Sequence, residues 1–174
     1  MRSVRKDGFR HDGGMDGYGY RVPSPEKRRL SKAWKAAHYF VSAGWREWLF
    51  IVGQTAAEVE RQLPAQGYLF ITAWNPPPGE STRESNLRAD ERLQARLAEL
   101  GVVHHAALGC DAHGSNVERG WLALDVPLHI ADALAREFGQ GGTLYWEAGE
   151  PVRLRMLWAP PSEPGDDESI DWVG

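Results

Sequence analysis

Seven side chains near the end of one predicted strand could together bind a small polar ligand. The run Gly67–Thr72 is apolar, aromatic and β-branched, so it predicts a buried strand. Three prolines, at 76–78, force the chain to leave the sheet after Asn75. An indole beside amides and arginines suits a base, a sugar or a nucleotide-like ligand. The predicted ligand-binding residues are Trp74, Asn75, Arg83, Asn86, Glu118, Arg136 and Gln140.

A helix that begins just after the prolines would position two of these residues. Ser81–Glu84 fits a capping box, which predicts a helix that runs to about Leu100. The first turn of a helix offers free N–H groups and partial positive charge, so Arg83 and Asn86 would lie at an anion-binding end. We expect the other acids and arginines of this helix to be solvated.

The same residues also have a purely structural interpretation. Asn75 could cap a turn, Trp74 could pack in the core, and Gln140 could close its own helix. Only the arrangement of the side chains in space distinguishes this interpretation from a binding site.

Metal binding is the first alternative chemistry. His104, His105, Cys110 and His113 are suitable ligand types, and Cys110 and His113 have a plausible chelating spacing. However, neighbouring residues of a strand point to opposite faces, so His104 and His105 cannot share one ion on a regular strand. No second close pair completes a tetrahedral site, and we therefore predict no metal and no cofactor.

Nucleophilic and carboxylate catalysis are two weaker alternatives. Cys110 precedes Asp111 in a predicted loop, but a nucleophile and its base usually come from separate segments. The sequence has neither a G-x-S-x-G elbow nor a phosphate-binding P-loop. Glu118 and Glu147 lie at predicted strand ends and could form an acid–base pair only if they converge.

The composition indicates one globular domain with two charged ends. A chain of 174 residues is long enough for one domain with a proper core. Residues 1–23 are rich in glycine and charge and predict a disordered basic extension, and residues 159–174 predict an acidic mobile tail. A single cysteine fits a reducing compartment, and no run of apolar residues is long enough for a membrane span, so we predict a cytoplasmic protein.

The alternation of helical and strand patterns predicts an α+β fold for residues 24–158. We expect a single domain with a mixed, mostly antiparallel sheet of about six strands. Three to four helices should pack mainly on one face of that sheet.

Four short motifs together resemble a bacterial protein family. They are TAWNP at 72–76, Ser85-Asn86 at the start of the following helix, a strand start with Trp and Glu at 118–121, and ALAREFGQ at 133–140. In this order they resemble the DUF3293 family, and the likeness covers roughly residues 30–157. After FGQ, Gly141-Gly142 stands where the family has an Asn or similar residue before a small apolar one. The resemblance implies a small bacterial α+β domain of unknown function.

Two functions from different classes fit these residues. The leading hypothesis is a non-enzymatic binding or interaction module that acts through Trp74 and Asn75. The rival is a small enzyme that acts on a nucleotide- or phosphate-bearing substrate at the same place. An enzyme requires the polar side chains to converge in a concave pocket, whereas a binding module tolerates a spread-out set. The expected partner is a protein or a small molecule; nucleic acid, through the basic arm, is less favoured, and no membrane partner is expected.

Overall fold

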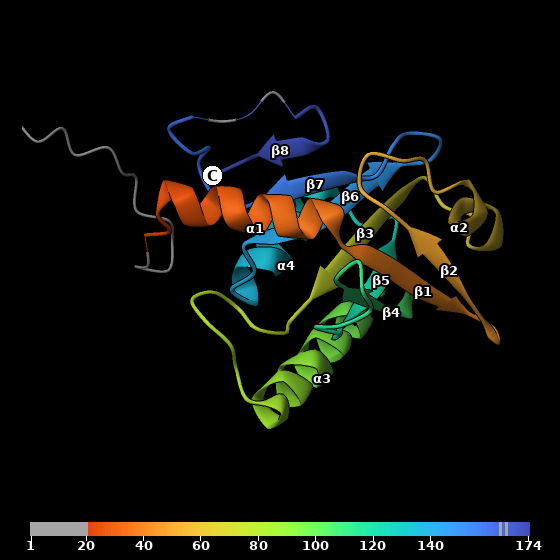
Figure 1. The fold of residues 1–174 in the computed structure, drawn as a ribbon. Coiled ribbons are helices and arrows are strands. Elements are labelled where there is room, and N and C mark those ends of the chain that lie inside the picture. The colour runs from red at the N-terminus through yellow and green to blue at the C-terminus, as the bar shows by residue number, and fades with distance from the viewer. Residues whose placement is uncertain (1–20, 164, 166) are drawn as a thin grey trace, which may run out of the picture.

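A curled sheet of eight strands organises the part of the chain that the structure describes (Figure 1). The computed structural model describes residues 21–163, 165 and 167–174. The strands are β1 (His38–Ala43), β2 (Arg46–Phe50), β3 (Gly67–Thr72), β4 (His104–Cys110), β5 (Glu118–Leu124), β6 (Gly142–Glu147), β7 (Arg153–Met156) and β8 (Ile170–Trp172). The helices are α1 (Ser24–Ala36), α2 (Ala57–Gln62), α3 (Arg83–Glu99) and α4 (Leu128–Glu137).

The predicted α+β fold with a mixed, mostly antiparallel sheet is confirmed. The strand order is β2-β1-β4-β5-β3-β6-β7-β8, and every neighbouring pair is antiparallel except β7 and β8. The sheet thus has eight strands rather than about six. The last of them, β8, lies in a segment whose net acidic charge concealed the short apolar strand pattern of Ile170 and Trp172.

Strand β3 lies in the middle of the sheet and is buried on both faces. Tyr68 and Phe70 belong to one core cluster, and Leu69 and Ile71 belong to another. Such double burial explains why the strand reads as a continuous apolar run rather than as an alternation.

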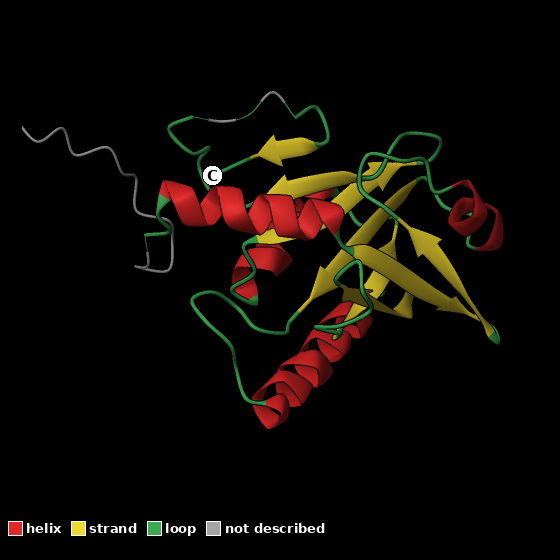
Figure 2. Cartoon of the chain, in the orientation of Figure 1, coloured by secondary structure: helices red, strands yellow, loops and turns green. Residues whose placement is uncertain are grey.

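The helices cover both faces of the sheet (Figure 2). Helices α1 and α2 pack on the Tyr68 face, where Trp34 and Val59 join an aromatic core. Helices α3 and α4 pack on the Leu69 face through Leu93, Leu97 and Leu134. The sequence predicts helices mainly on one face, because hydrophobic periodicity shows which side of a helix is apolar but not which face of the sheet it covers.

The two predicted extensions are described only in part. Of the predicted basic extension, residues 1–23, the first 20 residues lie outside the described part of the chain. Val22, which is described, is buried in the core. Within residues 159–174, β8 pairs with β7 beside α1, although the first and last elements are far apart in the sequence (Figure 1). Mobility of this tail in solution stays a prediction.

Candidate functional site

An asparagine pair, Asn75 and Asn86, connects the end of β3 to the first turn of α3. The backbone N–H of Asn75 donates to Oδ1 of Asn86, and Nδ2 of Asn86 donates to Oδ1 of Asn75, both at 2.9 Å. Oδ1 of Asn75 also accepts the backbone N–H of Ser81 at 3.0 Å. Asn75 has a φ of 46°, a left-handed conformation that asparagine tolerates better than most residues. The pair therefore holds both ends of the proline loop.

The helix begins one residue later than the sequence predicts. Thr82, not Ser81, is the N-cap, and its Oγ1 accepts the backbone N–H of Ser85 at 3.2 Å. Glu84 does not reach back to complete a capping box but forms an ion pair with Arg88. The backbone N–H of Ser81 is instead used by the asparagine pair, which explains the shift.

Glu118 extends this network to the start of β5. Nδ2 of Asn75 donates to Oε1 of Glu118 at 2.7 Å. Burial raises the pKa of Glu118, the hydrogen bond from Asn75 partly opposes this rise, and the charge of Glu80 adds to it. Burial also raises the pKa of Tyr39 far above its usual value, and the nearby charge of Glu118 contributes to that rise. Glu118 is thus a half-buried carboxyl group with no cationic partner among the described residues.

Trp74 and Gln140 join the same region through the backbone. Both side chains are buried, and Nε2 of Gln140 donates to the carbonyl oxygen of Trp74 at 3.1 Å. This bond connects the end of β3 to the segment that follows α4. The indole of Trp74 packs inside the protein, and its buried Nε1 has no hydrogen-bond partner within the described chain. It is therefore not an exposed stacking platform.

Arg83 and Arg136 lie apart from this network. Both side chains are exposed, and neither forms an ion pair or hydrogen bond with another described residue. Of the seven predicted residues, the structure brings together Asn75, Asn86 and Glu118 directly. It adds Trp74 and Gln140 next to them and leaves the two arginines outside.

A cleft of about 590 Å³ opens beside the asparagine pair, between the proline loop, α3 and the end of α4. Its lining includes buried Asn86 but none of the other six predicted residues. The lining residues are Ala73, Pro76, Ser81, Ser85, Asn86, Ala89, Arg92, Ala95, Arg96, Glu99, Glu137, Phe138 and Gly139.

Two arginines that sequence reasoning assigned to a solvated face line this cleft. Arg96 is paired with Glu99 at 3.4 Å and with Glu137 at 3.3 Å. Arg92 is exposed and forms no ion pair or hydrogen bond with the rest of the described chain. The residues that share one side of α3 are Ser85, Ala89, Arg92 and Arg96. Their spacing of three to four residues is the sequence pattern that could have predicted this wall of the cleft.

The alternative chemistries find little support in the geometry. In the described residues no group of three or more His, Cys, Asp and Glu side chains could hold a metal ion. Burial raises the pKa of the Cys110 thiol, which disfavours the reactive thiolate. Glu147 pairs with Gly67 at the start of β3, whereas Glu118 lies beyond its end, so the two carboxylates do not converge.

Comparison with known proteins shows that the cleft lies within a segment that matches a protein-family model. The model of the family described as "Protein of unknown function (DUF3293)" matches residues 71–142. The predicted resemblance to DUF3293 is confirmed. The DUF3293 match is narrower than the predicted span of 30–157, but it contains all seven predicted residues and the whole lining of the cleft.

The remaining comparisons add no relatives. No curated protein and no solved structure matches the chain. Among the described helices, none combines the length and apolarity needed to cross a membrane.

Proposed function

We propose that the DUF3293 segment is a binding module whose cleft between α3 and α4 takes a small organic anion. One observation carries this proposal: Arg92 lines the cleft without an acidic partner among the described residues. Arg96, one turn further along α3, is already paired with two glutamates. A cation left unpaired at the edge of a concave surface is well suited to an anionic group.

The other walls of the cleft favour a ligand with one anionic group and an apolar body. Ser81 and Ser85 supply hydroxyl groups near Asn86, and Pro76 and Phe138 supply apolar surface. The volume of about 590 Å³ falls within the range of small-molecule sites. Glu99 and Glu137 disfavour further negative charge, so a monocarboxylate or a singly charged phosphate ester fits better than a polyphosphate.

The hydrogen bonding of the site supports binding over catalysis. Both polar atoms of the Asn75 side chain are used by Asn86, Ser81 and Glu118. Gln140 is buried and directed to a backbone carbonyl. Glu118 lies on the Tyr39 side of the sheet and is absent from the lining of the cleft. The rival enzyme hypothesis would need free groups converging on one point, and these side chains act on one another instead.

A matched pair of arginine variants tests the proposal. Arg92 and Arg83 are both exposed and without partners on α3, but only Arg92 lines the cleft. Arg92→Gln and Arg83→Gln therefore change the net charge equally. We expect a thermal-shift screen of carboxylates, sugar phosphates and nucleotides to find a ligand that stabilises the wild-type protein. At about 100 times its dissociation constant, that ligand should add about 2.7 kcal/mol, or several degrees in melting temperature.

Calorimetric titration then locates the ligand. Loss of the guanidinium in Arg92→Gln should weaken binding at least about tenfold, whereas Arg83→Gln should bind as the wild type does. Equal losses in both variants would indicate general electrostatic attraction and contradict a site in the cleft. If the wild-type protein converts a bound ligand to product and Glu118→Gln abolishes this turnover, the result would instead favour the enzyme hypothesis.

A further inference from the structure

The outer edge of β7 is occupied by a segment from the end of the chain. Strand β8 lies parallel to β7, with Ile170 to Trp172 opposite Leu154 to Met156. The backbone N–H of Leu154 donates to the carbonyl oxygen of Ser169 at 2.8 Å. The N–H of Val173 donates to the carbonyl oxygen of Met156 at 3.0 Å. Residues 169–173 therefore complete the hydrogen bonding of a strand that would otherwise be an open edge.

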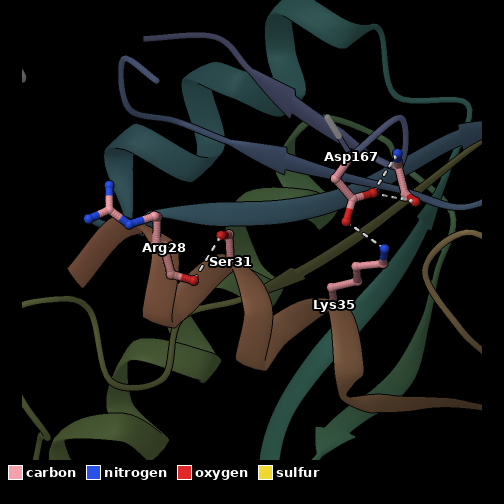
Figure 3. A network of polar contacts seen from close by, with 5 residues as sticks. Arg28, Ser31, Lys35 and Asp167 are labelled. Carbon is pink, nitrogen blue, oxygen red and sulfur yellow. Dashed lines mark hydrogen bonds and ion pairs between the residues drawn. The ribbon is translucent and has the colours of Figure 1, made fainter. Parts of the chain in front are cut away.

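Two acidic side chains fix this segment to cationic groups of the domain. Asp171 forms a two-point ion pair with Arg153 of β7, with N–O distances of 2.6 and 2.8 Å. Asp167 accepts a hydrogen bond from Lys35 near the end of α1 (Figure 3). On either side of Asp171, Ile170 and Trp172 pack against the core cluster on the Tyr68 face. Charge and apolar contact thus alternate along the segment.

The contacts of this segment are weaker than those of the inner strands. Only three residue pairs join β8 to β7, and parallel pairing is slightly less stable per residue than antiparallel pairing. The side chains of Arg153 and Asp171 are 42% and 35% exposed, so solvent screens much of their attraction. The preceding stretch, 159–168, is rich in proline and acidic residues and contains no helix or strand in its described part.

We propose that the edge of β7 is a docking groove for an extended acidic peptide of a partner protein. The residues that now occupy the edge indicate which peptide sequence it would bind. The pattern is an acidic residue, as at Asp167, followed three residues later by an apolar–Asp–apolar triplet, as at 170–172. Lys35 and Arg153 select the two acids, and the backbone of β7 adds the peptide as a parallel strand. The chain's own segment, residues 167–173, acts as an intramolecular competitor. The groove shares no residue with the cleft between α3 and α4.

The test uses the full chain and a labelled peptide with the sequence of residues 167–174. In the Asp171→Asn variant the chain's own segment loses its ion pair, whereas the peptide keeps its aspartate. We expect fluorescence anisotropy to show the peptide binding this variant at least about tenfold more tightly than the wild type, whose own segment competes. Adding Arg153→Gln to the variant should abolish the gain. Glu163→Gln, an equal change of charge at an exposed residue outside the segment, should behave as the wild type does.

Hydrogen exchange of the wild-type protein supplies an independent measurement. We expect the amides of Leu154 and Val173 to exchange far faster than those of β3, and the added peptide to leave the β3 amides unchanged. Amides of β8 that exchange only as slowly as those of β3 would overturn the proposal, because the edge would then open only on global unfolding. Equal peptide affinity for wild type and Asp171→Asn would also overturn it. Dimers with exchanged tails would assign the edge to a second copy instead.

Discussion

Asn75 and Asn86 exchange two hydrogen bonds of 2.9 Å across eleven positions of the chain. One bond joins a side chain to a backbone N–H group, and the other joins the two side chains. Asn86 is buried, so water does not compete for its amide. The pair therefore determines where α3 begins relative to the end of β3, and with it the position of one wall of the cleft.

The first prediction concerns the stability of the asparagine pair. Asn86→Ala should lower the free energy of unfolding by about 1–3 kcal/mol, because it removes the partner of the half-buried Asn75 N–H and one of the two donors to Asn75 Oδ1. Urea denaturation measures the loss. Gln94→Ala, an exposed change on the same helix, should stay within about 0.5 kcal/mol of the wild type. If the two variants were equally stable, the pair would contribute nothing to folding.

The second prediction concerns Glu118 and pH. Burial raises the pKa of Glu118, so the folded protein keeps this proton at pH values where the unfolded chain has released it. The contribution of Glu118 to the free energy of unfolding therefore falls as pH rises from near its ordinary value of 4.5 through the folded pKa. Glu118→Gln removes this fall, while its amide oxygen still accepts the hydrogen bond from Asn75.

The variant should therefore gain stability relative to the wild type as pH increases, and the difference should then level off. Urea denaturation of both proteins between about pH 4 and pH 8 measures it. Glu84→Gln, at an exposed ion pair on α3, is the control and should show no comparable trend. A constant difference between Glu118→Gln and wild type across this range would contradict a raised pKa.

Local sequence patterns predicted most of the fold because most elements carry their own signal. The β3 run, its proline stop and the helix after it each follow from residue type and spacing. The distribution of helices over both faces does not, because it depends on long-range packing. Strand β8 was missed for a different reason. Asp171 of β8 and Asp167 just before it pair with Arg153 and Lys35, which lie in distant segments, so the local acidic charge alone indicated a mobile tail.

The candidate site was predictable only in part. The motif residues Asn75 and Asn86 do meet, but they bind each other rather than an open space. Arg92 was missed because an arginine on an exposed helix face usually has no role beyond solubility. Its position beside the cleft depends on how α3 packs near the end of α4, which no local pattern reveals.

The third prediction compares two acid–arginine pairs of α4. Asp132 forms a two-point ion pair with Arg155 of β7 at 2.6 and 2.8 Å, and these side chains are only 14% and 15% exposed. Asp132→Asn should lower the free energy of unfolding by about 3 kcal/mol, because it leaves a mostly buried guanidinium without its counter-ion. Glu137→Gln breaks the exposed pair with Arg96 and should cost less than about 1 kcal/mol. Equal losses in thermal or urea unfolding would show that burial does not distinguish the pairs.

The fourth prediction concerns two glycines of neighbouring strands. A Cβ at Gly120 would lie 2.6 Å from the backbone oxygen of Ile71, which the sheet holds in place. A Cβ at Gly109 would lie 3.1 Å from the ring of Tyr39, a side chain that can shift slightly. Gly120→Ala should therefore destabilise the protein by about 3 kcal/mol or more, and Gly109→Ala by about 1 kcal/mol.

Urea denaturation of the two glycine variants separates a backbone clash from a side-chain clash. Both changes add one methyl group to a strand, so propensity and unfolded-state effects nearly cancel. A larger loss for Gly109→Ala would mean that β5 can move away from β3 more easily than Tyr39 can turn. The expected order instead requires the β3–β5 ladder to be the rigid part of the sheet, which also fixes Glu118 next to Asn75.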